Sequence, residues 1–151
     1  MRVSFIGGGT DLPDYYLYNS FGSVISTAIN KYVYVSVKNH PDIYDERIRI
    51  SYSLTELVNE VKDIKNNIIR SAFQFLNITE RIHVLIYSDV PASTGLGSSS
   101  AFAVALLMAL HRFRGDHFTN AQVAEEACHI EMSLLSSKVG KQDQYASAFG
   151  G

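Results

Sequence analysis

The alternation of apolar and polar residues predicts several short β-strands. Residues 2–6 form an apolar stretch that leads into Gly7-Gly8-Gly9, where consecutive glycines allow a tight turn. Three further stretches alternate or are rich in β-branched and aromatic residues, and each is predicted as a strand: 32–37, 47–51 and 82–87. Residues 22–29 carry a fainter version of the same pattern and are a further strand candidate.

Helical periodicity dominates two other regions. Between Leu54 and Leu76 apolar residues recur three or four positions apart, which predicts one long amphipathic helix with its apolar face in the core. A second helix should begin within Ser98–Ser100, and its largely apolar sequence predicts that it is buried.

The last third of the chain predicts two more helical elements. Thr119 can cap a third helix with its hydroxyl while Gln122 answers three residues later, and this helix should run to about Leu134. A short fourth element is predicted for residues 141–149. Strands and helices thus alternate in a mixed order, without a repeat or a linker.

Composition limits the class of protein. The 151 residues are 46% hydrophobic and 19% charged, which is typical of a single packed domain. Thirteen basic and fifteen acidic residues give a net charge of −2 with no basic run, so no nucleic-acid partner is expected. No apolar stretch approaches the roughly 18 residues of a membrane span. One cysteine, Cys128, fits a reducing compartment, and we expect a cytoplasmic protein without a membrane partner.

The segment Pro91–Ala101 carries the most informative chemistry. It follows an apolar strand and precedes an apolar helix, so its glycines can wrap backbone N–H groups around an anion at a helix N-terminus. The hydroxyls of Ser98–Ser100 suit phosphate and can also bind Mg²⁺, which prefers hard oxygen ligands. The simpler interpretation is that Gly and Ser only form a loop and a helix cap.

Other glycine motifs fit this sequence poorly. The one Gly-Lys pair, Gly140-Lys141, is followed by Gln142 instead of the Ser or Thr of a Walker loop. Leu12 stands where the dinucleotide fingerprint requires its third glycine. Gly97-x-Ser99 resembles the nucleophile elbow of an esterase, but no histidine lies in a suggestive motif, which argues against a hydrolase.

Acidic residues supply a second set of candidates. Asp143 lies in the polar run 140–145 and could accept or orient a hydroxyl proton beside a cation. Glu131 could complete a magnesium site with a serine of the loop, unless it belongs only to the solvated face of its helix. Thr10 and Asp11 offer groups suited to sugar hydroxyls, although Asp11 could simply cap the segment that follows. Arg2 could be a surface charge.

Three separated segments resemble the superfamily of galactokinase, homoserine kinase, mevalonate kinase and phosphomevalonate kinase. Residues 2–11, Arg-Val-Ser-Phe-Ile-Gly-Gly-Gly-Thr-Asp, resemble the first motif of its sugar-1-kinase branch, especially heptose 7-phosphate kinases and fucose kinases. Residues 91–101 resemble the second motif, and residues 139–146 resemble the segment that carries the catalytic aspartate. Gly8-Gly9 stand where galactokinases have Glu-His, which argues against galactose as the substrate.

The resemblance implies roles for individual residues. It makes Asp143 the catalytic aspartate, Glu131 the magnesium glutamate and Arg2 the arginine near the reacting phosphate. Sugar binding would fall to Gly9, Thr10, Asp11 and Asp143, and the best metal ligand among the serines would be Ser99. The implied nucleotide-binding residues are Pro91, Gly95, Leu96, Gly97, Ser98, Ser99, Ser100 and Ala101.

The resemblance also implies a fold and a reaction. The expected fold is α+β, a two-layer α/β sandwich like the ribosomal-protein-type domain of the superfamily. The expected reaction transfers a phosphoryl group from ATP, with Mg²⁺, to the anomeric hydroxyl of a sugar or sugar phosphate, first of all heptose 7-phosphate. Because members continue into a second domain, residues 1–151 are expected to be a fragment without that partner domain and a poor enzyme alone. A nucleotide-binding module without turnover is the alternative, and an RNA-binding domain is a remote one.

Overall fold

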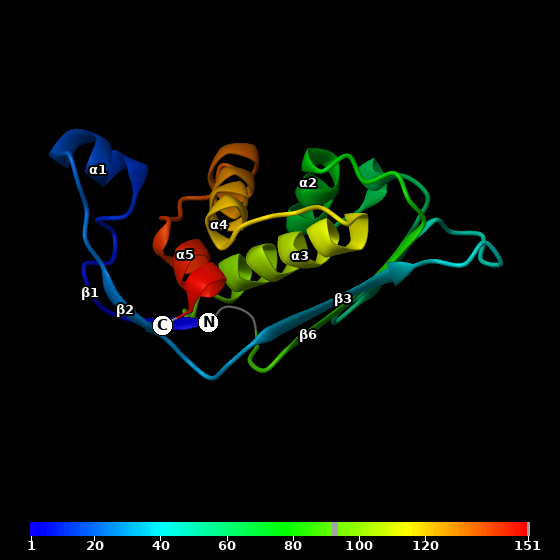
Figure 1. Ribbon diagram of the computed structural model, residues 1–151, viewed down its shortest axis with the longest axis horizontal. Helices are drawn as coiled ribbons and strands as arrows, with labels where there is room; N and C mark the ends of the chain where they lie inside the picture. Colours follow the sequence, from blue (N-terminus) through cyan, green and yellow to red (C-terminus); the bar gives the residue numbers. More distant parts are fainter. Residues whose placement is uncertain (92–93, 151) are drawn as a thin grey trace.

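The computed structural model describes residues 1–91 and 94–150, and it has two layers (Figure 1). A four-stranded sheet forms one layer, in the order β3-β6-β4-β5. Its strands are β3 (Val33–Asn39), β4 (Ile48–Ser51), β5 (Thr55–Val58) and β6 (Ile82–Ser88). Helices cover one face of this sheet: α2 (Asn67–Phe75), α3 (Ser98–Arg114), α4 (Asn120–Cys128) and α5 (Gln142–Phe149). The α+β sandwich expected from the sequence is confirmed.

The register of the sheet separates its two faces. β6 pairs antiparallel with β3 and parallel with β4, and β4 pairs antiparallel with β5. Alternate residues of β4 and β6 are buried beneath the helices, and they are Ile48, Ile50, Ile82 and Val84. The largest apolar side chains of α3 complete this core from above, namely Leu106, Leu107 and Leu110. The side chains between them point to the opposite face, because a strand has a period of two.

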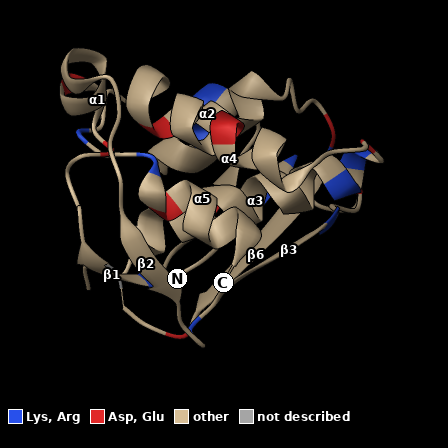
Figure 2. Cartoon of the chain, turned by 60° about the vertical axis from the view of Figure 1, so that its left-hand side comes forward, with Lys and Arg blue, Asp and Glu red and all other residues tan. Residues whose placement is uncertain are grey.

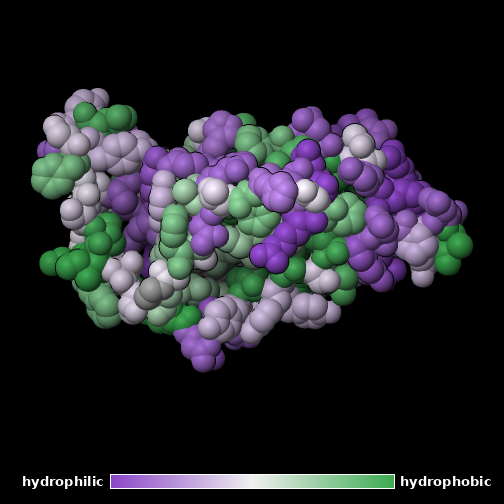
Figure 3. Space-filling view, in the orientation of Figure 1, coloured by the Kyte–Doolittle hydropathy of each residue, from purple (hydrophilic) through white to green (hydrophobic). Residues whose placement is uncertain are grey.

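A smaller unit stands beside the sandwich. β1 (Arg2–Ile6) and β2 (Ile25–Ala28) form an antiparallel ribbon, and α1 (Pro13–Asn19) lies in the connection between them. No residue of α1 is buried. We call the ribbon and α1 together the amino-terminal arm; its apolar side chains form hydrophobic areas at one end of the molecule (Figure 3).

The prediction of one long helix from Leu54 to Leu76 is wrong. The region contains β5, a 3-10 turn (Val61–Asp63) and the short helix α2. Leu57 is 54% exposed whereas Glu56 beside it is buried, which is the reverse of the amphipathic assignment. Pairing of β5 with β4 outweighs the helical spacing, and Asn66 caps a new helix start by accepting a hydrogen bond from Ile69 N–H.

The other predicted elements are present. The strands at 2–6, 22–29, 32–37, 47–51 and 82–87 correspond to β1, β2, β3, β4 and β6, with small shifts at their ends. Thr119 caps α4 as predicted, but the Gln122 side chain donates to Glu126 and does not return to the cap. The third helix continues to Leu134 as a π-helical segment, His129–Leu134. Within the described ranges, no helix has the length and apolar character needed to cross a membrane.

Candidate active site

The loop between β6 and α3 has the backbone geometry of an anion site. Gly95 and Gly97 both adopt positive φ, +73° and +69°, which favours glycine. Gly97 is the cap residue of α3, and the first hydrogen bond of that helix runs from Ala101 N–H to its carbonyl at 2.9 Å. In the part of the chain that the structure describes, no backbone N–H of residues 95–100 donates to a protein acceptor. These donors lie at a helix N-terminus, where an anion could accept from them.

A cavity of about 710 Å³ opens beside this loop. The loop contributes Pro91, Gly95, Gly97 and the serines 98–100 to its wall. The rest of the wall is mainly apolar and comes from the sheet and helices, and it includes Val33, Tyr52, Ile68, Ile86 and Phe102. Asp143 lies in the same wall, so an apolar chamber, the loop and a carboxylate share one space.

Arg2 joins the loop to the start of α5. Its Nε donates to Asp143 Oδ1 at 2.6 Å, and its Nη1 donates to the carbonyl of Gly95 at 2.9 Å. The side chains of Arg2 and Asp143 are only 13% and 21% exposed, so Arg2 is not a surface charge. A Cβ on Gly97 would lie 3.0 Å from Asp143 Oδ2, so the missing side chain allows the loop and the acid to approach. Sequence positions 2, 97 and 143 therefore converge.

Asp11 fixes the other side of α5. Its Oδ1 accepts a hydrogen bond from Gly9 N–H at 3.0 Å, and its Oδ2 accepts one from Gln142 N–H at 3.1 Å. The cap residue of α1 is Leu12, without a side-chain bond, so Asp11 does not cap that helix. A Cβ on Gly140 would lie 1.9 Å from Asp11 Oδ2, which makes glycine necessary there.

Thr10 and Ala101, two of the predicted site residues, do not line the cavity. The hydroxyl of Thr10 donates to the carbonyls of Gly7 and Ser23, and therefore stabilises the turn after β1. Ala101 is buried in the first turn of α3 and does not line the cavity. Leu96 contributes its carbonyl, which accepts a hydrogen bond from Arg2 N–H at 3.2 Å.

Glu131 and Ser99 are in direct contact. Ser99 Oγ donates to Glu131 Oε1 at 2.9 Å, and Gln144 Nε2 donates to Glu131 Oε2 at 2.7 Å. Glu131 is only 3% exposed, which excludes the solvated-face interpretation. The π-helical segment that contains Glu131 is a rare geometry, often found where a helix carries function.

The oxygen atoms around Glu131 form a donor set that fits Mg²⁺. Glu131 and Ser99 line a second cavity of about 380 Å³, next to the loop. Gln144 Oε1 is buried and accepts no hydrogen bond. The Glu131 carboxylate and the Ser99 hydroxyl, which both line this cavity, are hard ligands of the kind Mg²⁺ prefers, usually together with water and substrate phosphates. No group of three or more His, Cys, Asp or Glu residues that could hold a metal occurs within residues 1–91 and 94–150.

Residues that the sequence did not single out hold α5 in place. Ser4 Oγ donates to Gln142 Oε1 at 2.5 Å. Tyr145 O–H donates to Glu125, and Lys141 Nζ lies 3.5 Å from the same carboxylate. The hydrogen bond to Glu125, with burial, raises the pKa of Tyr145 to about 12, so its hydroxyl remains a donor. The polar run 140–145 was the available signal, but its partners are remote in sequence.

Cys128 has no nucleophilic role at this site. Burial, followed by the charge of Glu125, raises the pKa of its thiol to about 12. A thiol with this pKa stays protonated at neutral pH and is a poor nucleophile.

A family profile described as the GHMP kinases N terminal domain matches residues 59–151. The D-glycero-alpha-D-manno-heptose 7-phosphate kinase of Campylobacter jejuni is 31% identical over 100% of this chain and 47% of its own length. The galactokinase of Thermotoga maritima is 24% identical over 99% of this chain and 42% of its length. The chain thus spans about half the length of these curated relatives.

Solved structures show the same arrangement. A D-glycero-D-manno-heptose 1-phosphate kinase from Bacteroides thetaiotaomicron superposes with a TM-score of 0.85 at 26% identity, over 100% of this chain and 52% of that one. A mevalonate kinase superposes with a TM-score of 0.74 at 20% identity, over 98% of this chain and 49% of that one, which is a likeness of fold. The profile match covers more than half of the 151 residues, and the chain therefore belongs to the GHMP kinases, with the fold of their N-terminal domain.

Proposed function

We propose that this chain is the nucleotide-binding and sugar-binding half of an ATP-dependent kinase that phosphorylates the anomeric hydroxyl of a sugar or sugar phosphate. The observation that carries the proposal is the meeting of Asp143 with the loop at residues 95–100, where Arg2 contacts both. A carboxylate beside unpaired helix N-terminal amides is the arrangement that phosphoryl transfer to a hydroxyl requires.

The loop would bind the phosphates of the nucleotide, and the cavity beside it would bind the base. The N–H groups of residues 95–100 would donate to the phosphates of ATP, since the positive end of the α3 dipole favours negative charge there. The apolar wall formed by Ile68, Ile86 and Phe102 would take the base, because nucleotide pockets combine apolar surface with a few polar groups.

Ser99 and Glu131 would hold the magnesium ion. Bound there, Mg²⁺ would neutralise charge on the phosphates during transfer. Gln144 would keep the Glu131 carboxylate oriented through its hydrogen bond of 2.7 Å. Either serine neighbour, Ser98 or Ser100, would lie close enough along the helix start to contact the phosphates as well.

Asp143 would receive the acceptor hydroxyl. Its Oδ1 is already bound by Arg2, which leaves Oδ2 to accept the hydroxyl proton or to orient the hydroxyl for in-line attack. The Arg2 guanidinium would then help to balance charge on the transferred phosphoryl group. Asp11, Gly9 and Thr10 would shape the sugar side of the cleft through the turn that follows β1.

Heptose 7-phosphate is the proposed acceptor. The support is the relative from C. jejuni, which is a heptose 7-phosphate kinase by name, together with the Gly-Gly-Gly-Thr-Asp segment at residues 7–11. Because the relatives are about twice as long, we expect residues 1–151 alone to phosphorylate sugars poorly and to need the remaining half of the cleft. In that case nucleotide binding without turnover would be the property of the isolated chain.

A kinase assay on the complete protein tests the proposal. The assay would follow ADP release with a panel of free sugars and sugar 7-phosphates, and ³¹P NMR would show whether the new phosphate is on the anomeric oxygen. We expect turnover with a heptose 7-phosphate and a new anomeric phosphate signal. Absence of turnover on the entire panel, by a folded protein that binds ATP, would support the non-catalytic alternative.

A further inference from the structure

The face of the four-stranded sheet that the helices do not cover carries a row of basic side chains. Lys38 of β3 pairs in register with His83 of β6, and His83 pairs in register with Arg49 of β4. Neighbouring strands lie about 4.7–4.9 Å apart, and residues paired across them point to the same side of the sheet. The three side chains therefore form one continuous group, which we call the basic row.

The positive charge of the basic row is largely uncompensated by carboxylates. Within the described ranges, neither Lys38 nor Arg49 forms an ion pair, and the buried Nε of Arg49 has no hydrogen-bond partner. Glu46 Oε1 lies 3.3 Å from His40 Nε2, and the charge of Arg49 contributes to lowering the pKa of Glu46. His83 itself has only a long contact, 3.5 Å, with Ser51 Oγ.

The pKa of His83 also reflects the excess of positive charge in the basic row. Burial lowers the pKa of His83, and the positive charges of Lys38, Arg49 and His40 lower it further. Lys38 and Arg49, which flank this imidazole in the basic row, are both cations. Like charges placed opposite one another across a sheet are unfavourable, and a bound anion would relieve that repulsion.

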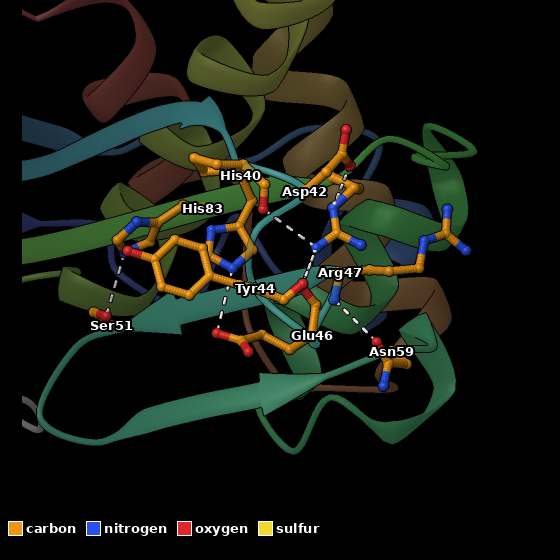
Figure 4. A network of polar contacts seen from close by, with 10 residues as sticks. His40, Asp42, Tyr44, Glu46, Arg47, Ser51, Asn59 and His83 are labelled. Carbon is orange, nitrogen blue, oxygen red and sulfur yellow. Dashed lines mark hydrogen bonds and ion pairs between the residues drawn. The ribbon is translucent and has the colours of Figure 1, made fainter.

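Hydrogen bonds and a ring stack connect the loop after β3 to the sheet beside the basic row. Arg81 donates to the carbonyls of Pro41, Tyr44 and Glu46 and so holds the loop after β3 against the sheet. Tyr44 stacks on His40 with their ring centroids 4.8 Å apart, and His83 lies beside them with Ser51 beyond it (Figure 4). In the cartoon coloured by charge, basic and acidic positions lie together at the end of the molecule to which β3 points (Figure 2).

We propose that Lys38, His83 and Arg49 form a phosphate-binding site on the open face of the sheet, separate from the phosphate loop. Arginine offers a planar fork of donors, lysine adds a point charge and histidine adds a third donor, which together match a phosphate dianion. Lys38 lies five residues along β3 from Val33, which lines the cavity beside the phosphate loop. This separation along the strand corresponds to about 17 Å. The ligand is inorganic phosphate or the phosphate group of a small metabolite.

NMR of the histidine side chains tests this site directly. The chain would be titrated with sodium phosphate, and separately with glucose 6-phosphate, at constant ionic strength maintained with chloride. We expect the imidazole signals of His83 to shift in a saturable manner, and its pKa to rise in the complex because the anion favours the charged ring. Saturation by both probes indicates recognition of phosphate alone, and saturation by one probe identifies the source.

Variants make the assignment specific. Arg49→Gln and Lys38→Gln should each weaken the apparent affinity at His83 by about tenfold, as expected for one charge-assisted contact. Lys62→Gln is the matched control, since Lys62 is an exposed lysine paired with Glu60. A shift of His83 that does not saturate with either probe would overturn the proposal, as would unchanged affinity in Lys38→Gln, an exposed position at which folding is expected to be unaffected.

Discussion

The sandwich and the candidate active site of this protein are stabilised in different ways. In the sandwich, apolar side chains from the sheet and from α2, α3 and α4 form one buried cluster, in which Phe73, Ile50 and Leu107 are fully buried. At the site, polar side chains from the amino-terminal arm, the loop and α5 bind one another across gaps such as the 141 positions between Arg2 and Asp143.

The sandwich provides most of the stability of the fold, and the site positions the groups that would carry the chemistry. Burial of apolar area stabilises the sandwich without regard to direction, at about 25 cal/mol per Å². Hydrogen bonds at the site contribute less free energy, about 0.5–1.5 kcal/mol each, but they fix atoms in position. Substitutions at the site should therefore reduce turnover more than stability, and substitutions of polar groups within the sandwich should do the opposite.

The largest effect is expected for Asp143→Asn. The amide keeps the size of the side chain but cannot accept a proton, so turnover of the complete protein should fall by about 10²–10⁴-fold while ATP binding persists. A sugar kinase assay and an ATP titration measure the two properties. Asp14→Asn, in the exposed helix α1, is the control. Near-normal turnover of Asp143→Asn would remove this residue from catalysis.

Glu131→Gln should separate metal binding from folding at the site. The amide retains hydrogen-bonding capacity beside Ser99 and Gln144 but lacks the negative charge, so Mn²⁺ or Mg²⁺ affinity in the presence of ATP should fall by roughly 10–100-fold. Mn²⁺ binding can be followed by electron paramagnetic resonance. Glu80→Gln, on an exposed turn, should change nothing. Metal affinity equal to that of the unmodified protein would place the ion elsewhere.

Glu56→Gln tests the sandwich instead. Burial disfavours the charge of Glu56, but hydrogen bonds from Lys65 N–H, Tyr52 O–H and Asn66 N–H outweigh it and lower its pKa below the ordinary 4.5. The ionised form therefore stabilises the fold at pH values above 4.5, and this contribution is lost as the pH falls through the folded pKa.

The substitution should reduce the free energy of unfolding by about 1–3 kcal/mol at neutral pH. It should also make the stability less sensitive to acid, which urea unfolding at several pH values measures. Glu60→Gln provides an exposed control. Equal stability of Glu56→Gln and the unmodified protein across this range would contradict the account.

The smallest effect is expected for His111→Gln, in the contact between α3 and α4. Burial disfavours the charged ring, but hydrogen bonds with Glu126 and Asp116 outweigh it and raise the pKa of His111 above 6.5. The stabilisation is therefore complete below pH 6.5 and is lost as the pH rises through the folded pKa.

His111→Gln should remove that pH dependence and cost about 1 kcal/mol at slightly acidic pH. Thermal unfolding from about pH 6 to about pH 9 follows the change, because histidine titrates in this interval. The exposed His117→Gln should retain the normal profile. A normal profile in His111→Gln would show that another group causes it.

Local signals made much of the fold predictable. Short apolar, β-rich or alternating stretches located five strands, one of them as a weaker candidate, and the hydroxyl of Thr119 located the start of α4, because these features depend on neighbours in sequence. The region from Leu54 to Leu76 failed for the converse reason. The helical pattern is interrupted there because β5 pairs with β4 and because the carboxylate of Glu56 accepts hydrogen bonds from the amides before α2. Neither contact can be recognised from the spacing of hydrophobic residues. The helix α1 was also missed.

The same distinction applies to the site: its local features could be predicted from the sequence, and its long-range contacts could not. Glycine and serine content predicted the loop, since backbone conformation and helix capping are local properties. The roles of Gln144, Tyr145 and Ser4 could not be predicted, because each depends on a partner that only the folded chain brings close. The π-helical turn that directs Glu131 inward had no recognisable signal in the helical pattern.

Binding of MgATP to the loop tests the central claim most directly. Backbone amide signals of residues 95–100 would be followed by NMR while MgATP is added to the folded chain, with AMP as the control that lacks the outer phosphates. The account predicts large, saturable shifts at these amides with MgATP and small shifts with AMP. Saturable binding elsewhere, with the amides of residues 95–100 unchanged, would contradict the assignment of this loop as the phosphate site.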